Sequence, residues 1–275
     1  MNADAKLPAT IGLIAGNGRF PLMFARAARA RGIRVVAAAV RGDTSILIHF
    51  FADDVAWFAP GELGKLFSYF RGRGVRHALM AGQINPENLF RKDMPVDDDD
   101  FKAVFDALKD RRCDTIFGAI ADRLKAEGME LLDSTLLTRE YLAPKGTLTR
   151  RAPTVAELKD VEFGMAIARQ MGALDVGQTV VIRGLAIVAI EAMEGTDHCI
   201  RRGGRIAREG AVVVKMAKPA QDLRFDVPVI GPRTIQAMRQ VRATCLAIEA
   251  GKTLIIDREH TLALANKAGI TFLGA

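Results

Sequence analysis

The chain has 275 residues, of which 49% are hydrophobic, 26% charged and only 6% aromatic. Because a typical domain has about 100 to 200 residues, this length predicts two domains, and the many small aliphatic side chains favour an α/β fold over a β-sandwich. The net charge of +7 favours anionic partners, but the lysines and arginines are scattered and are not interleaved with aromatic residues, so we expect no nucleic-acid partner.

The cysteines and the start of the chain indicate a cytoplasmic protein. Cys113, Cys199 and Cys245 are far apart and odd in number, so they predict neither a zinc site nor a disulfide framework. The opening stretch MNADAKLPAT lacks the apolar core of a signal peptide. No run reaches the ~20 apolar residues of a membrane span, so we expect any membrane contact to be peripheral.

The first half of the sequence alternates strand patterns with helical patterns. Buried strands are predicted at 9–16, 32–40, 54–58, 77–82 and 129–134. Helices are predicted from Pro21 onward and at 61–73, 99–109 and 114–127. This order predicts an N-terminal Rossmann-like domain with a doubly wound parallel sheet.

Two stretches of this half allow either a functional or a structural interpretation. The segment 61–74 combines apolar positions with Lys65 and Arg71, as a helix on a membrane surface does, but the same pattern packs a helix onto a sheet, which we favour. The acidic run 97–100 resembles a metal site. Neighbouring side chains point apart, however, so we favour a helix N-terminus there.

A change of composition divides the chain. Residues 142–154, LAPKGTLTRRAPT, replace the hydrophobic periodicity with prolines, threonines and cations. We therefore predict an N-terminal domain at 1–143, a linker at 144–153 and a C-terminal domain at 154–275, which includes the acidic and basic segment described below.

The second half has a less regular order of elements. It opens with Thr154 and Glu157, the capping box of a helix that extends to about residue 171. Strands are predicted at 178–184, 185–192, 211–217, 252–257 and 270–274, and further helices at 233–250 and 258–268. These elements predict a mixed α/β domain.

The turn GNGRFP at 16–21 lies between the first strand and the first helix, which is the layout of a phosphate or nucleotide cradle. A dinucleotide fingerprint needs a third glycine where Pro21 stands and an acid where the second strand ends at Val40. These departures weigh against an NAD site. A tight turn without a ligand remains an alternative, while the donors of Asn17 and Arg19 favour a bound ligand.

The segment 215–231, KMAKPAQDLRFDVPVIG, concentrates charged side chains. They are Lys215, Lys218, Asp222, Arg224 and Asp226. In an extended conformation the last three share one face, because side chains alternate along a strand. Two carboxylates and a guanidinium on one face suit a divalent metal and phosphate oxygens. The alternative is a set of solvated ion pairs in a surface loop.

Further candidate residues lie upstream of that segment. Glu191 is a carboxylate inside an apolar strand, where it needs a partner or a function. Thr196 and Asp197 follow it and either bind a ligand or cap a helix. For Asp122 we favour a place on the solvent face of the predicted helix at 114–127.

Three motifs resemble the LpxI family of UDP-2,3-diacylglucosamine diphosphatases, which act in lipid A biosynthesis. They are IGLIAGNGRFP at 11–21, AGQINP at 81–86 and KPAQDLRFDVPVIG at 218–231. The likeness spans nearly the whole chain, and the third motif is the most specific. It implies two domains with the active site in the cleft, where Mg2+ and water split the pyrophosphate to give UMP and 2,3-diacylglucosamine 1-phosphate.

The resemblance also implies roles for individual residues. Asp226 matches the family's catalytic aspartate and Asp222 belongs to the same motif, so both are candidate Mg2+ ligands. Asp226 is either a metal ligand or the general base, and the ordinary acidity of an aspartate favours the ligand role. Cations expected to neutralise the pyrophosphate charge are Lys215, Lys218 and Arg224. The substrate-binding candidates are Gly16, Asn17, Gly18, Gly82, Gln83, Asp122, Glu191, Thr196, Asp197 and Gln221.

The expected partners follow from this interpretation. They are a nucleotide-linked diacylglucosamine and, for a peripheral protein on the inner face of the inner membrane, anionic inner-leaflet lipids. A homo-oligomer remains open. The rival interpretations are a noncatalytic sensor of a lipid or sugar nucleotide and an NAD-dependent oxidoreductase.

Overall fold

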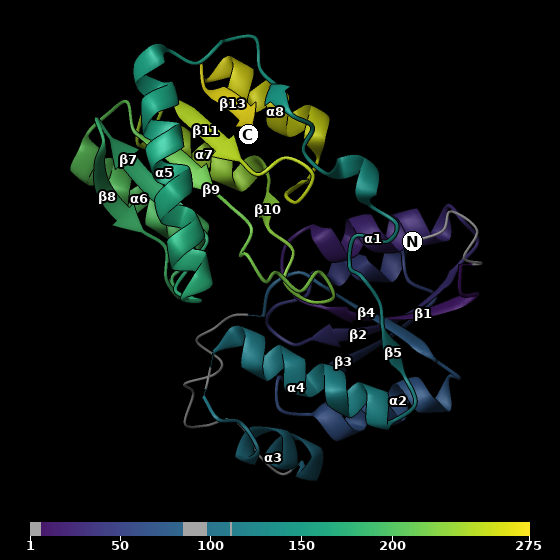
Figure 1. Cartoon of the computed structure of the whole chain (residues 1–275). Helices are drawn as coiled ribbons and strands as arrows, with labels where there is room; N and C mark the ends of the chain where they lie inside the picture. The colour runs from purple at the N-terminus through teal and green to yellow at the C-terminus, as the bar shows by residue number, and fades with distance from the viewer. Residues whose placement is uncertain (1–6, 85–97, 111) are drawn as a thin grey trace. The chain divides into compact units, whose positions relative to one another are not determined.

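The computed structural model describes residues 7–84, 98–110 and 112–275. Its contacts divide the chain into two units (Figure 1). The first unit comprises residues 1–138 together with 222–226, and the second comprises 139–221 and 227–275. The short segment 222–226 therefore packs with the first unit, although the sequence pattern placed it inside a continuous C-terminal domain.

The first unit contains a parallel sheet of five strands in the order β3-β2-β1-β4-β5. The strands are β1 (Thr10–Ala15), β2 (Arg34–Val40), β3 (Asp54–Phe58), β4 (His77–Ala81) and β5 (Glu130–Leu131). The helices are α1 (Phe20–Arg29), the 3-10 helix η1 (Ile46–Phe50), α2 (Leu63–Gly72), α3 (Asp99–Asp106) and α4 (Cys113–Ala126). Figure 1 shows α1 on one side of the sheet and α2 and α4 on the other. The predicted Rossmann-like class is confirmed.

The strand order of the first unit contains a switch point. From β1 the chain builds β2 and β3 on one side, and then returns to build β4 and β5 on the other side of β1. In open α/β sheets ligands bind at such a point, outside the carboxyl ends of the strands. The turns that follow β1 and β4 are therefore where the fold itself predicts a ligand.

The second unit contains a mixed sheet of six strands in the order β6-β13-β11-β9-β7-β8. Its strands are β6 (Gly146–Thr147), β7 (Thr179–Arg183), β8 (Ala186–Ile190), β9 (Val212–Lys215), β11 (Cys245–Ile248) and β13 (Thr271–Gly274). A separate pair consists of β10 (Val229–Ile230) and β12 (Leu254–Ile255). The neighbours β9, β11 and β13 are parallel, whereas β6, β7 and β8 pair antiparallel. The predicted mixed α/β class is thus confirmed.

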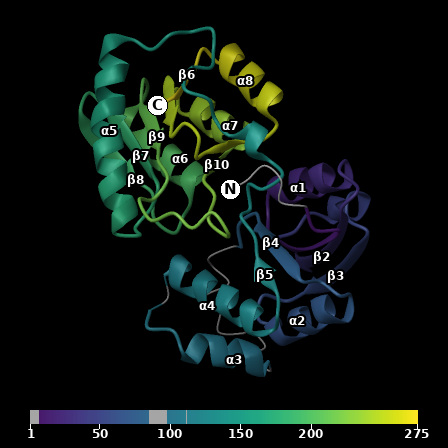
Figure 2. The same cartoon turned by 45° about the vertical axis from the view of Figure 1, so that its right-hand side comes forward.

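Helices cover both faces of this sheet (Figure 2). They are α5 (Val155–Ala173), α6 (Thr196–Ala207), α7 (Pro232–Gln240) and α8 (Arg258–Lys267). The short 3-10 helix η3 (Arg139–Tyr141) packs against β12 instead. Alternate residues of β7 point to opposite faces, so Val180 packs in the cluster under α5 while Val181 packs in the cluster under α6 and α7. The predicted capping box of α5 is present, with Thr154 accepting from the backbone of Glu157.

The prediction of one helix over 233–250 is wrong. Helix α7 ends at Gln240, and Arg242 adopts a positive φ of 53° in the turn that follows. Residues 245–248 then form β11 in the middle of the sheet, between β9 and β13. A short run of Ala, Leu and Ile fits a helix face and a fully buried strand equally well, which is why periodicity misassigned it.

Several smaller differences concern short strands. The strand predicted at 129–134 is reduced to β5, and the strand predicted at 252–257 is reduced to β12. The sequence pattern missed β6 and β10 altogether. Each of these strands has only two residues, too few for an alternating pattern to be recognised.

Both structural interpretations made for the first half are confirmed. Helix α2 buries its apolar positions, which are Leu63, Leu66, Phe67 and Phe70. Asp98 is the N-cap of α3, and its side chain accepts a hydrogen bond from the backbone of Phe101. Asp97 lies outside the described residues.

Among the described helices, none has the length and apolar character needed to span a bilayer.

Two thiols of the second unit are predicted to be unreactive in the folded protein. Burial raises the pKa of Cys199 and of Cys245 to about 12, and both side chains are fully buried. At pH 8 neither thiol is ionised or accessible. A Cys113→Ser variant should therefore react with a thiol reagent only after denaturant is added. Rapid labelling of the native variant would contradict the packing of β11 and α6.

Candidate functional site

The glycine turn after β1 is joined directly to the turn after β4. The backbone N–H of Gly16 donates to the Ala81 carbonyl oxygen at 2.8 Å, and that of Asn17 donates to the Gln83 carbonyl oxygen at 2.7 Å. Asn17 and Gln83 form an isolated antiparallel bridge. The five cradle candidates, Gly16, Asn17, Gly18, Gly82 and Gln83, therefore lie together at the switch point. Asn85 and Pro86, the last two residues of the second motif, AGQINP, lie outside the described residues.

Glycine is required where the two turns meet. Gly82 has a φ of +84°, and a Cβ on it would overlap the carbonyl oxygen of Asn17. A Cβ on Gly16 would lie 2.6 Å from the Gln83 carbonyl oxygen. Gly18 has a φ of +83° and open space around it. The first two glycines thus permit a close backbone approach, whereas Gly18 permits the reversal of the chain before α1.

The segment 222–226, called the acidic turn below, is not extended. The backbone N–H of Asp226 donates to the Asp222 carbonyl oxygen at 3.0 Å, which closes a single turn. The prediction that Asp222, Arg224 and Asp226 alternate on one face of a strand is therefore wrong. Pro219 and Pro228 flank the segment and prevent its extension as a helix, but they do not prevent one closed turn.

Contacts within the first unit hold the acidic turn at the carboxyl end of β4. Ser134 is 1% exposed, and its hydroxyl lies 2.6 Å from the Met80 carbonyl oxygen and 2.7 Å from the Arg224 carbonyl oxygen. The backbone N–H of Ser134 donates to the Leu223 carbonyl oxygen. Since Met80 precedes Gly82 by two residues, the acidic turn and the glycine turns share one edge of the sheet.

An aromatic contact adds to these hydrogen bonds. The rings of Phe225 and of Phe117, on α4, are stacked with centroids 5.7 Å apart. Phe225 also packs against the hydrophobic cluster beneath α2 and α4. Neither Ser134 nor Phe225 is among the residues that the sequence pattern predicts for the site, although Ser134 stands at the end of a predicted strand.

The charged groups of the acidic turn are paired. The guanidinium of Arg224 donates from Nε to Asp222 Oδ1 at 3.0 Å and from Nη2 to Asp222 Oδ2 at 2.6 Å. This hydrogen bonding lowers the pKa of Asp222 below its usual value, and the same pairing raises the pKa of Arg224. Asp122, exposed on α4 as predicted, adds a smaller electrostatic contribution to Arg224. Asp222 therefore orients an exposed cation.

A second group of candidates lies in the second unit. Lys215, at the end of β9, donates from Nζ to the hydroxyl of Thr196 at 2.6 Å, and Nζ lies 3.9 Å from Glu191 Oε2. Thr196 in turn donates to Glu191 Oε1 at 2.9 Å. Glu191 Oε2 is buried and has no hydrogen-bond partner among the described residues. Glu191 follows β8 rather than lying inside it, which corrects its predicted place.

The remaining candidates of the second unit also have partners. Lys218 Nζ lies 2.5 Å from a carboxylate oxygen of Asp175, and both side chains are largely buried. The sequence gave no signal for Asp175. Gln221 accepts from the Lys218 backbone N–H at 2.8 Å, and Asp197 accepts from the Thr234 hydroxyl at 3.0 Å.

Neither Thr196 nor Asp197 caps α6. The N-cap residue of this helix is Gly195, which has a φ of +79°. Thr196 and Asp197 are instead the first two residues of the helix, where the acidic side chain of Asp197 is favourable toward the helix dipole. The capping alternative for these two residues is therefore wrong.

The acidic turn contains the carboxylates that the sequence predicts as metal ligands. Within residues 7–84, 98–110 and 112–275, no three His, Cys, Asp or Glu side chains are grouped closely enough to hold a metal ion. Mg2+ normally needs only one or two protein carboxylates, because water and substrate phosphates complete its shell. The acidic turn carries two carboxylates, those of Asp222 and Asp226, and both Asp222 oxygens bind the guanidinium of Arg224.

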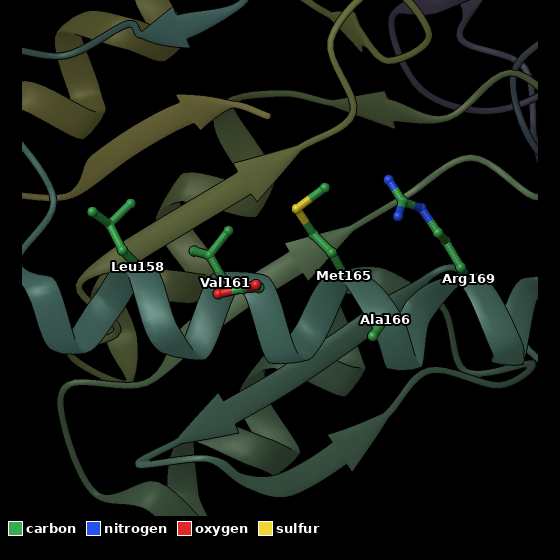
Figure 3. A pocket seen from close by; sticks show the side chains of 6 residues that line it. Leu158, Val161, Met165, Ala166 and Arg169 are labelled. Carbon is green, nitrogen blue, oxygen red and sulfur yellow. The ribbon is translucent and has the colours of Figure 1, made fainter.

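A shallow groove of the second unit runs along α5 (Figure 3). Its lining residues are Leu158, Val161, Glu162, Met165, Ala166 and Arg169. In Figure 3 the Met165 and Arg169 side chains extend from the same side of the helix as Leu158. None of the predicted site residues lines this groove.

Comparison with known proteins gives three matches. The family model described as the LpxI N-terminal domain matches residues 10–141, and the one described as the LpxI C-terminal domain matches residues 144–273. A relative from Caulobacter vibrioides, UDP-2,3-diacylglucosamine pyrophosphatase LpxI, is 31% identical over 276 residues. That alignment covers 96% of this chain and 96% of the relative.

Proposed function

We propose, from the premise that this chain belongs to the LpxI family, that it is an enzyme that hydrolyses the pyrophosphate bond of UDP-2,3-diacylglucosamine. The products would be UMP and 2,3-diacylglucosamine 1-phosphate. The observation that supports this most is the placement of the acidic turn beside the glycine turns at the switch point of the first unit. A cradle for phosphate and a carboxylate for metal-assisted hydrolysis would thereby share one edge of one sheet.

The cradle would bind the anionic part of the substrate. Helix α1 begins at Phe20, directly after the glycine turn, and its first backbone N–H groups have no partner within the helix. Such a helix start attracts phosphate through its dipole and its free donors. Pro21 costs nothing there, because the first turn of a helix does not need its N–H. Gly18 keeps the approach open, since no side chain extends from it.

We propose that Asp226 is the carboxylate that holds Mg2+. When bound there, the ion would supply positive charge for the pyrophosphate oxygens and acidify a water molecule. Asp222 would hold the guanidinium of Arg224 toward the developing negative charge of the phosphates. Lys215 and Lys218 belong to the second unit, where each already has a carboxylate partner.

Hydrolysis in oxygen-18 water tests this function. The purified chain is incubated with UDP-2,3-diacylglucosamine, once with Mg2+ and once with a chelator, and the products are identified by mass spectrometry. We expect UMP and the lipid monophosphate only with Mg2+, with the label on one of the two products. Intact substrate that is nevertheless bound under both conditions would replace the hydrolase with a noncatalytic sensor.

We also propose that the protein works as a peripheral protein on the inner face of the inner membrane. A diacylated substrate resides in a bilayer, and the net charge of +7 favours anionic lipids. Attraction of this kind weakens as salt screens the charges. Membrane-bound protein in a cell lysate should therefore be released by high salt without detergent.

A further inference from the structure

The 3-10 helix η1 of the first unit presents apolar side chains to solvent. Ile46, Leu47 and Phe50 are 64%, 48% and 69% exposed, whereas Ile48 is fully buried and anchors the helix. Single exposed apolar residues are common on soluble proteins. Three of them within five residues, on a helix fixed by its own buried anchor, form a contiguous apolar projection instead.

The helix that packs against η1 carries exposed arginines near its end. Helix α1 packs against η1, and Arg29 Nη1 donates to the Phe50 carbonyl oxygen at 2.9 Å. Arg26 lies three residues earlier on the same face of α1, and Arg31 follows the end of the helix. All three arginines are exposed. We call Ile46, Leu47 and Phe50, with these three arginines, the η1 patch.

One carboxylate close to η1 in the sequence, that of Asp53, is directed at the sheet. Asp53 follows η1 in the sequence, but its Oδ2 accepts a hydrogen bond from the Val35 backbone N–H at 2.8 Å. Its carboxylate is thus directed at the backbone of β2. The η1 patch therefore combines exposed apolar side chains with exposed arginines.

We propose that the η1 patch docks on an anionic phospholipid bilayer. Apolar side chains on a short surface helix penetrate about 5–10 Å into the boundary between headgroups and acyl chains, while flanking arginines pair with lipid phosphates. This inference deepens the proposed function only in its partner, the bilayer that holds a diacylated substrate. Its failure would leave hydrolysis of detergent-dispersed substrate unchanged, so the two proposals can fail separately.

The chain provides a spectroscopic reporter at this place. Trp57 is the sole tryptophan, and it lies on β3, the edge strand of the sheet. Its indole Nε1 donates to Nε2 of His49 on η1 at 3.2 Å. Tryptophan fluorescence therefore comes from a single side chain that contacts η1.

The experiment uses the full chain with vesicles of phosphatidylcholine alone or mixed with phosphatidylglycerol. We expect sedimentation with the anionic vesicles only, and quenching of Trp57 when the lipids carry brominated acyl chains. A variant with Ile46→Ser, Leu47→Ser and Phe50→Ser should bind the anionic vesicles with an affinity at least about tenfold lower, because the apolar insertion is lost. A variant with Arg26→Gln, Arg29→Gln and Arg31→Gln should lose the preference for anionic lipid.

A matched control replaces exposed apolar residues of the second unit. Val155, Leu174 and Ile206 are 72%, 65% and 61% exposed, and their combined change to serine should leave vesicle binding intact. Equal binding by the η1 variant, or binding without quenching of Trp57, would overturn the proposal. The proposal would also be overturned if the wild-type chain bound no vesicles and formed a dimer that the η1 substitutions dissociate. The η1 patch would then contact a second copy of the chain. Thermal unfolding of each variant shows whether it is folded.

Discussion

An Asp226→Ala variant should lose at least about a thousandfold in turnover of UDP-2,3-diacylglucosamine, because the carboxylate proposed to hold Mg2+ is removed. Substrate binding should change little, since the glycine turns and Arg224 remain in place. Both quantities can be measured on the same preparation, turnover by release of UMP and binding by calorimetry in the presence of a chelator. Wild-type turnover in this variant would exclude Asp226 from the reaction.

Two further variants separate the possible reasons for such a loss. Asp222→Ala should cost less, about ten- to a hundredfold, because Asp222 acts by holding Arg224. If instead Asp222→Ala abolished turnover while Asp226→Ala retained it, the two aspartates would exchange roles. Glu209→Ala serves as the control, since Glu209 is an exposed residue of the second unit. Its turnover should equal that of the wild type.

The second large effect concerns stability. A Gly82→Ala variant should lower the free energy of unfolding by about 2–4 kcal/mol, of which a positive φ accounts for about 1–2 kcal/mol and the overlap with the Asn17 carbonyl oxygen for the rest. The strain would separate the turns after β1 and β4, so substrate affinity should fall as well. Denaturant unfolding followed by circular dichroism measures the first quantity.

Gly74 provides a matched control for this variant. It also has a positive φ, +69°, but a Cβ on it would meet no atom within 4 Å. Gly74→Ala should therefore show only the conformational cost of about 1–2 kcal/mol. If the two variants were equally destabilised, the close approach of Gly82 to the Asn17 carbonyl oxygen would contribute nothing to the stability of the fold.

The parallel sheet of the first unit could be predicted because each of its longer strands is a buried apolar run. The stretches at 9–16 and 32–40 have no alternation, which is typical of strands covered by helices on both faces. The same property misassigned β11, since its buried run gives no period that separates a strand from a helix. The hydrophobic pattern of a short segment thus predicts whether the segment is buried more reliably than whether it is a strand or a helix.

The residue types of the candidate site could be predicted from the sequence, but their contacts could not. The residue types at 222–226 predicted phosphate and metal chemistry, but not the closed turn, which depends on Ser134 and on the ring of Phe117. Those partners lie about ninety residues or more away in the chain. Likewise the ion pair between Lys218 and Asp175 joins residues that have no common motif. Contacts over such separations leave no periodic trace in a sequence.

Residues 222–226 belong to the first unit although the sequence on both sides of them belongs to the second. Neither unit is therefore a continuous piece of the chain. The chain changes unit three times, after residues 138, 221 and 226, so no single cut releases either unit whole. A fragment that ends at residue 141 would keep the glycine turns and lose Asp226 together with the ring that stacks on Phe117. Exchange of one half between relatives, by recombination or by design, would therefore give the first unit an acidic turn from one protein and glycine turns from another.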